Sequence, residues 1–186
     1  MPGKTWFTSD THFGHANIIG YCNRPFRSVG EMDAALAANW NAVVMPEDQV
    51  WHLGDFCYRG AKSPSSYLAR LNGRKHLIWG NHDSAEARDA DGWTSSQAMA
   101  EIAVGGRRIV LLHYGMRVWS RSHHGSLHLY GHSHGSLPGD SQSCDVGVDV
   151  PEWAYRPVSL TEIERHLRTL PPREPQDRHG RAGGMD

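Results

Sequence analysis

The sequence has little of what marks several large classes of protein. It contains three cysteines, an odd number, spaced far apart and without a Cys-x-x-Cys pair, which argues against a disulfide framework or a cysteine zinc site. The formal net charge is only −1, so no global field favours nucleic acid or an anionic membrane. Apolar runs of the length of a membrane span or a signal peptide are also missing. We therefore expect a cytoplasmic protein with no membrane partner.

The chain is long enough for one domain and shows neither an internal repeat nor a linker. We predict a single domain over residues 1–170. From Pro171 to Asp186 the sequence is rich in proline, arginine and glycine and has almost no apolar residues. This composition predicts a disordered C-terminal tail over residues 171–186.

Short apolar runs alternate with helical patterns along the first half of the chain. The patterns predict strands over 4–9, 49–53 and 74–79 and helices over 16–21, 29–44 and 63–71. This βαβ rhythm is typical of a largely parallel sheet with helices outside it. The patterns in the second half of the chain predict a helix and loop over 84–96, a hairpin of 98–104 with 107–112, and strands over 126–130 and 144–150. A last helix is predicted to run to about residue 170, and Ser159 and Glu162 form a capping box at its start.

Polar residues stand where the expected strands end. The residues in question are Asp10 and His12, then Asp55, then Gly80-Asn81-His82-Asp83, then His113, and finally His132 and His134. Ligands of such sheets gather at the carboxyl ends of strands, so we expect these residues to share one site. Asp10 and His12, two apart on an extended segment, would point the same way. Two of these blocks have a plain structural alternative: Asp10 would cap the following helix, and Gly80–Asp83 would form an ordinary turn. His52 lies inside a strand and is interpreted as structural.

These residues form a set of oxygen and imidazole donors without a thiolate, in a chain with 13 histidines. Such donors suit Mn, Fe, Zn or similar divalent ions. Seven ligands are too many for one tetrahedral site and suit two ions about 3.5–4 Å apart. One carboxylate must then bridge, and Asp55, the middle one, is the candidate. We predict two divalent metal ions as cofactors, with the ligands Asp10, His12, Asp55, Asn81, His113, His132 and His134.

The order Asp-x-His, Gly-Asp, Gly-Asn-His-Asp, His, Gly-His-x-His between Asp10 and His134 resembles the calcineurin-like metallophosphoesterase superfamily, in particular its small single-domain bacterial and phage members. All five blocks are present and in order. The resemblance implies an α/β fold, a four-layer αββα sandwich in which two mixed sheets lie face to face with helices on both outer sides. It also implies hydrolysis of phosphate esters by a hydroxide that bridges two metals.

The resemblance further implies a role for each block. One metal would be held by Asp10, His12, Asp55 and His134, and the other by Asp55, Asn81, His113 and His132. His82 would not bind metal but would protonate the leaving oxygen as general acid. Asp83 would orient the His82 imidazole.

Candidates for binding the phosphate group are Arg59, Arg24 with Asn23, and His123 in the loop 117–124. For each arginine, a solvated side chain with a charge partner is the alternative. The protein phosphatases of the superfamily have an aspartate just before the arginine that corresponds to Arg59. This chain has Tyr58 there, so we do not expect a protein phosphatase.

We expect an enzyme that hydrolyses a small phosphate ester, a phosphodiester in preference to a monoester. The alternative among enzymes is a nuclease acting on short or single-stranded nucleic acid, which would then be the substrate and not a separate partner. The alternative of another class is a non-catalytic module that binds metal or a phospho-ligand on the same fold. Loss of His82 or of a ligand would mark such a module, and neither is lost here.

Overall fold

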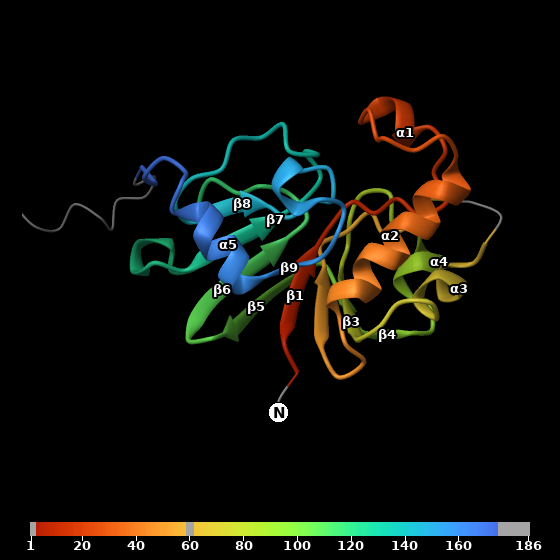
Figure 1. Cartoon of the computed structure of the whole chain (residues 1–186). Coiled ribbons are helices and arrows are strands. Elements are labelled where there is room, and N and C mark those ends of the chain that lie inside the picture. Colours follow the sequence, from red (N-terminus) through yellow and green to blue (C-terminus); the bar gives the residue numbers. More distant parts are fainter. Residues whose placement is uncertain (1–2, 59–61, 175–186) are drawn as a thin grey trace, which may run out of the picture.

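The computed structural model of the protein describes residues 3–58 and 62–174, and two sheets organise them (Figure 1). In the first sheet four strands run parallel and an antiparallel strand closes one edge. The order across this sheet is β4 (Trp93–Gln97), β3 (Arg74–Ile78), β2 (Gln49–His52), β1 (Thr5–Thr8) and β9 (Val158–Ser159). Because β1, β2 and β3 are parallel, the segments that follow them leave the sheet at the same edge.

The second sheet combines a hairpin with two parallel strands. Its order is β5 (Met99–Val104), β6 (Arg107–Leu112), β7 (Leu127–Tyr130) and β8 (Ser143–Asp145). The turn Gly105-Gly106 joins the antiparallel pair β5–β6 as predicted, and both glycines have positive φ, which a tight hairpin turn requires. Strands β6, β7 and β8 are parallel, so the residues after β6 and β7 also emerge at one edge.

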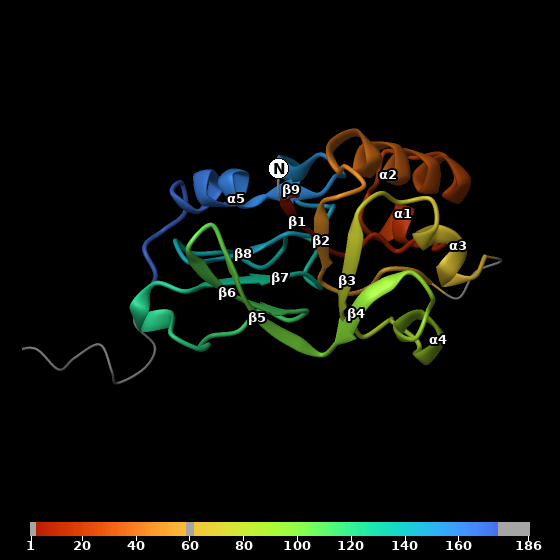
Figure 2. The same cartoon turned by 90° about the horizontal axis from the view of Figure 1, so that it is seen from below.

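Helices flank the sheets, and Figure 2 shows α2, α3 and α4 on the side of the first sheet that faces away from the second. The helices are α1 (Ile18–Tyr21), α2 (Val29–Val43), α3 (Pro64–Leu68), α4 (Ala85–Arg88) and α5 (Leu160–Leu167), with the 3₁₀ turns η1 (Ser122–His124) and η2 (Pro151–Trp153). The predicted capping box at the start of α5 is confirmed. Among the described residues every helix is too short or too polar to span a membrane.

Alternate residues of the first sheet supply two separate cores. On β1, Trp6 packs with Met32 and Trp40 of α2, whereas its neighbour Phe7 packs between the sheets with Ile109 and Leu129. Successive side chains of a strand point to opposite faces, so a strand covered on both faces needs apolar residues in succession. This is why β1, β2 and β3 each contain two adjacent apolar residues, Trp6-Phe7, Val50-Trp51 and Leu77-Ile78.

The outer face of the second sheet is covered by residues 114–126, which include η1. On this face the ring of Trp119 lies 5.2 Å from that of His128, and the Met116 amide donates to His128 Nε2 at 3.0 Å. With α2 to α4 beyond the first sheet, the layers are helix, sheet, sheet, and a loop with a short helix. The predicted α/β sandwich of two mixed sheets is thus confirmed.

Two strands were not expected from the sequence. Residues 93–97 form β4, although Trp-Thr-Ser-Ser-Gln has no apolar pattern, because β3 offers its free edge and pairs with them from Lys75 to Ile78. The short β9 forms in the same way, by pairing with Trp6 and Phe7 of β1. An edge strand needs hydrogen bonds from its neighbour more than it needs an apolar face.

The residues directly after residue 170 pack against the surface of the domain. The Arg173 guanidinium lies 3.8 Å from the ring centroid of Trp119, contacts Asp140 at 3.2 Å, and donates to the Arg117 carbonyl at 2.7 Å. Residues 171–174 are therefore docked, contrary to the predicted tail boundary at 171. The remainder of that tail, 175–186, lies outside the described residues.

Candidate metal centre

The side chains that the sequence places at strand ends converge on one edge of the two sheets. Two groups of three side chains each bring one nitrogen or oxygen atom within 4.8 Å of one another. The groups are Asp10, His12 and His134, and Asp55, His113 and His132. Each group combines residues from both sheets, because β1 and β2 carry the aspartates while β6 and β7 lead to His113, His132 and His134. All six were candidates from the sequence.

The backbone at these positions is not extended, which corrects the expectation for Asp10 and His12. Both have left-handed backbones, with φ of 58° and 50°, as do Asp55, His132 and His134. Left-handed residues other than glycine are uncommon, and aspartate and histidine tolerate this conformation better than bulky residues. Such strain persists where the surrounding structure dictates it, and it clusters at functional sites.

Two glycines let the backbone approach the carboxylates closely. A Cβ atom on Gly80 would collide with Asp55 Oδ1, and one on Gly131 would collide with Asp10 Oδ2. The neighbouring amides use this proximity: the amide of His82 donates to Asp55 Oδ1 at 2.8 Å, and that of His132 donates to Asp10 Oδ2 at 3.0 Å. One oxygen of each carboxylate is thus held by the backbone, and the other faces the histidines.

Around Asp10 the protein leaves buried polar atoms without partners. Asp10 Oδ1 and both ring nitrogens of His12 are buried and have no hydrogen-bond partner within the described part of the chain. Burial raises the pKa of Asp10 well above its usual value, and burial, followed by the charge of His134, lowers the pKa of His12 to about 2. Unpaired buried groups of this kind are costly, and a cation between them would remove the cost.

The second group is preorganised by a neutral oxygen. Asn81 Oδ1 lies 3.0 Å from His113 Nε2 and 2.9 Å from His132 Nδ1. His113 Nδ1 is 2.7 Å from the Leu53 carbonyl, so Nδ1 carries the proton and Nε2 presents its lone pair to the site. Three donor types, amide oxygen, imidazole and carboxylate, therefore meet at one point.

Asp55 belongs to the second group and also lies close to the first. Its Oδ2 atom is 3.6 Å from His12 Nε2 and 3.6 Å from His113 Nε2, one histidine from each group. Its side chain is 2 % exposed. An oxygen placed evenly between two sets of donors is what a bridging ligand of a two-metal site requires.

Asp83 has a different task from the one the sequence suggested. Its buried carboxylate accepts three backbone hydrogen bonds, from Gly80 at 2.8 Å and from Asp55 and Phe56 at 2.9 Å. Burial raises the pKa of Asp83, and these amides counteract part of the rise. Within the described residues its oxygens make no hydrogen bond to the His82 imidazole. Asp83 therefore ties the loop after β3 to the loop after β2, instead of orienting His82.

His82 itself is exposed and borders an open cavity. The cavity has a volume of about 590 Å³ and is also lined by His12, His134 and α1 residues such as Tyr21. The His82 ring centroid lies 5.5 Å from that of His12. The imidazole is thus close to the ligand groups but remains accessible to solvent and to a substrate.

Arg24 is not available to a substrate, which corrects its prediction as a phosphate contact. Its guanidinium is buried and pairs with Asp149 through two bonds, 2.8 Å from Nε and 2.7 Å from Nη2. Its remaining donors bind the carbonyls of Asp10 and Thr11. Every donor nitrogen is engaged inward, so Arg24 holds the loop that carries Asp10.

Sequence reasoning missed the two residues that flank His134. Asp149 Oδ2 lies 2.7 Å from His134 Nδ1, and Cys22 Sγ lies 3.3 Å from the same nitrogen. Burial lowers the pKa of His134, but the bonds to Asp149 and Cys22 outweigh it and raise the pKa to about 10. A carboxylate on the far nitrogen orients a ligand histidine. Nothing in the local sequence around Asp149 indicates this contact.

The other residues that the sequence suggested for substrate binding differ in where they lie. Asn23 lines the cavity. His123 lies in η1, on the outer side of the second sheet, and is not among the described residues that line the cavity. Arg59 lies outside the described residues.

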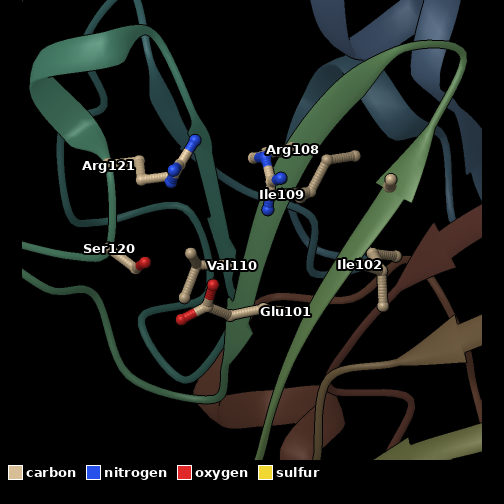
Figure 3. Close-up of a pocket in the computed structure, with 8 residues that line it drawn as sticks. Glu101, Ile102, Arg108, Ile109, Val110, Ser120 and Arg121 are labelled. Atoms are coloured by element: carbon tan, nitrogen blue, oxygen red, sulfur yellow. The ribbon is translucent and has the colours of Figure 1, made fainter.

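A second hollow lies on β5 and β6 and lacks this chemistry. Figure 3 shows Glu101 and Arg108 on the two strands and Ser120 and Arg121 on the facing loop. Its volume is about 140 Å³, and no histidine or aspartate lines it among the described residues. It is therefore a poorer candidate for metal-assisted chemistry than the edge near Asp55.

Comparison with known proteins agrees with the geometry. The profile of the calcineurin-like phosphoesterases matches residues 3–156. An uncharacterized protein of Methanocaldococcus jannaschii, MJ1445, is 36% identical over 169 residues, which are 86% of this chain and 89% of that protein. The gene 66 protein of Mycobacterium phage L5 is 41% identical over 91 residues, 47% of this chain and 44% of that protein.

A solved structure has the same fold. The protein of unknown function AQ665 from Aquifex aeolicus superimposes with a TM-score of 0.69 at 25% identity, covering 88% of this chain and 99% of that one. The family profile spans the second sheet, all of the first sheet except β9, and both candidate ligand groups. The chain therefore belongs to the calcineurin-like phosphoesterases and is a metal-dependent hydrolase of phosphate esters.

Proposed function

We propose that the protein is a dinuclear phosphoesterase whose preferred substrate is a small phosphodiester. The observation that carries the proposal is the position of Asp55 Oδ2, 3.6 Å from a histidine of each candidate ligand group. Asp10, His12 and His134 would share one divalent ion with Asp55. Asn81, His113 and His132 would share the other with the same carboxylate.

The unpartnered atoms fit this assignment. Asp10 Oδ1 and His12 Nε2 are buried without hydrogen bonds in the described chain, and both belong to the first ligand group. The donors are oxygen and imidazole, which suit Mn, Fe or Zn. Two such ions, when bound, supply Lewis acidity toward a phosphoryl oxygen and lower the pKa of water to about 7.

The charges of the site favour an anionic substrate. Two divalent cations carry four positive charges, and the ligand carboxylates of Asp10 and Asp55 neutralise two of them. The remaining positive charge attracts a phosphate oxyanion and stabilises the charge that grows in the transition state.

A diester suits the cavity better than a monoester. The described residues that line the cavity include no lysine or arginine, and the charge of Asp149 is already paired with Arg24. A dianionic monoester would find no further cationic side chain there, whereas a diester carries one negative charge. The small net charge of the chain gives no support to a long polyanionic substrate.

His82 is the proposed general acid. It borders the cavity beside His12, and its backbone amide is fixed by a 2.8 Å bond to Asp55 Oδ1. Seven other donors would serve the two metals, which leaves its imidazole to donate a proton to the leaving oxygen. Positioned acids contribute about 10²–10⁴ in rate, and most where the leaving group is a poor one.

Two variants test the assignment. Protein purified without chelator should hold close to two equivalents of transition metal, and Asp55→Asn should lose both ions by elemental analysis. Full occupancy in that variant would show that Asp55 does not bridge.

His82→Ala should keep both metals and hydrolyse an alkyl phosphodiester about 10²–10⁴-fold more slowly than the wild type. The loss should be much smaller on a nitrophenyl phosphodiester, because its leaving group needs no proton. His124→Ala, an exposed histidine in η1, is the control and should resemble the wild type. Equal losses on both esters would assign His82 to phosphate binding, and a lost metal would make it a ligand.

A further inference from the structure

Strand β5 forms a free edge of the second sheet (Figure 1). It is the outermost strand, beside β6, and these two strands of six residues are the longest in the described chain. The edge strand β4 of the first sheet is shorter and has no apolar pattern. A free edge presents unpaired amide and carbonyl groups, so a strand of another chain can bind to it. Of these two edges, β5 is the longer and the less polar.

The hairpin turn fixes which backbone groups of β5 face outward. A turn of two residues makes the pair that closes it, Val104 with Arg107, a hydrogen-bonded pair. Bonded and non-bonded pairs alternate along an antiparallel ladder, so Met99, Glu101 and Ala103 turn their amides and carbonyls away from β6. Within residues 3–58 and 62–174 no backbone hydrogen bond joins these three residues to another element. The outer edge of β5 is therefore unpaired along its whole length.

The two faces of β5 carry different chemistry. On the face toward the first sheet, Ala100 is buried in the core, and Ile102 and Val104 pack against that core but stay half-buried. On the other face, Glu101 and Arg108 of β6 line the hollow shown in Figure 3. Neither of these two charges forms an ion pair in the described part of the chain. A further strand beside β5 would extend the core on one face and lie next to two unpaired charges on the other.

We propose that β5 pairs with β5 of a second copy of this chain, antiparallel and about a twofold axis. Residues on the same face must stand opposite each other, which limits the possible registers. The register that sets Ile102 against the partner's Ile102 places Glu101 opposite the partner's Ala103 and forms a hydrogen-bonded pair on each side of the axis. Centring the axis on Glu101 would set two like charges directly opposite each other, which is destabilising. Centring it on Ala103 would bring the Gly105-Gly106 turn into the ladder and leave one bonded pair.

Opposite charges meet across the axis in the register centred on Ile102. Ala103 stands opposite Arg108 in the β5–β6 ladder, so only the partner's Ala103 separates Glu101 from the partner's Arg108. Two strand spacings are about 9–10 Å, and glutamate and arginine side chains that extend toward each other span this distance above the small alanine. The symmetry forms this contact twice. An interface between two identical surfaces requires such self-complementarity, and this is why a second copy is the partner that fits the edge.

The dimer would leave both candidate metal centres open. Met99 at the start of β5 pairs with Leu112, the residue before His113, so this end of β5 lies at the edge that carries the site. The Gly105-Gly106 turn lies at the opposite edge. Antiparallel pairing therefore sends the two centres to opposite ends of the joined sheet. The inference goes beyond the proposed function and does not depend on it, because its test needs neither metal nor substrate.

Sedimentation velocity between about 5 µM and 0.5 mM measures the association, because a single pair of strands makes a small and weak interface. We expect the mass of the wild type to rise from one chain toward two over this range. Glu101→Lys and Arg108→Glu should each weaken the dimer at least about tenfold, because like charges then face each other. The double variant exchanges the charges and should restore the dimer. Glu47→Lys, an exposed charge before β2, is the control and should associate as the wild type does.

Ala103→Pro tests the backbone contact separately. Proline here removes an outward N–H and no bond of the β5–β6 ladder, so the variant should keep a Tm within a few degrees of the wild type and remain a single chain. A wild type that stays a single chain at every concentration overturns the inference. A wild-type dimer that the charge reversals and the proline leave unchanged also overturns it, because another surface then joins the two copies. The double variant guards against misfolding, since it must both fold and associate.

Discussion

Replacing Asp83 by asparagine removes one negative oxygen from a carboxylate that joins two loops of the site. In the wild type Oδ2 accepts from the amides of Gly80 and Asp55, and Oδ1 accepts from the amide of Phe56. The asparagine oxygen can take the position of Oδ2 and keep two bonds. Its NH₂ group then faces the Phe56 amide, so a buried donor loses its acceptor.

The magnitude follows from that lost bond. A hydrogen bond to a charged group contributes about 1.5–3 kcal/mol, and a buried donor without a partner costs about 1–3 kcal/mol. We expect Asp83→Asn to lower the free energy of unfolding by about 2–3 kcal/mol, a fall in Tm of about 4–12 °C for a chain of this size. Metal affinity should fall as well, because the amide of Phe56, the residue directly after Asp55, is no longer held.

The matched control is Asp48→Asn. The Asp48 carboxylate is also buried and also accepts three hydrogen bonds, from the amides of Lys4 and Met45 and from the Trp6 indole. It precedes β2, whereas Asp55 follows it, so the two aspartates lie at opposite ends of the strand. Asp48→Asn should lose similar stability and leave metal content unchanged.

Calorimetry, elemental analysis and hydrolysis of alkyl and nitrophenyl diesters measure the outcome. Our reasoning requires that both esters slow together in Asp83→Asn, in proportion to lost metal. A variant with unchanged Tm and full metal, slowed only on the alkyl ester, would refute it. That result would return Asp83 to the role of orienting His82.

Three further predictions concern the scaffold. Bonds from Arg156 and Ser159 outweigh burial and lower the pKa of Glu162 to about 2. The Glu162 carboxylate therefore stabilises the fold above its ordinary pKa near 4.5, and this stabilisation is lost as the pH falls from there to about 2. Urea unfolding should show Glu162→Gln less stable than the wild type by about 1 kcal/mol at pH 7, and this difference should disappear over the same pH range. Arg173→Ala should lower Tm by a few degrees, and no change in calorimetry would mean that its contacts are incidental. Arg24→Ala should destabilise by about 3–5 kcal/mol through the buried charge left on Asp149; chemical denaturation equal to wild type, with weaker substrate binding, would restore Arg24 as a phosphate contact.

The sequence by itself was sufficient for the family and for most of the framework. Adjacent apolar residues in β1, β2 and β3 were visible because these strands are covered on both faces. The glycine pair of the β5–β6 hairpin and the capping box of α5 were visible because turns and caps depend on residues a few positions apart. The candidate ligands were visible because each block follows a strand, and parallel strands deliver their ends to one edge.

Only the tertiary structure decided which partner each polar group takes. Asp83 bonds to residues 27 and 28 positions away, and Arg24 pairs with Asp149 across 125 positions. Contacts between residues so far apart in the sequence leave no periodic pattern in the chain. The sequence therefore suggested a local role for each residue: Asp83 was expected to orient the adjacent His82, and Arg24 was expected to bind the substrate. The left-handed backbone of Asp10 and His12 and the edge strand β4 also arise from packing. Local patterns reflect local geometry, whereas the choice among distant donors, acceptors and free strand edges is made when the two sheets come together.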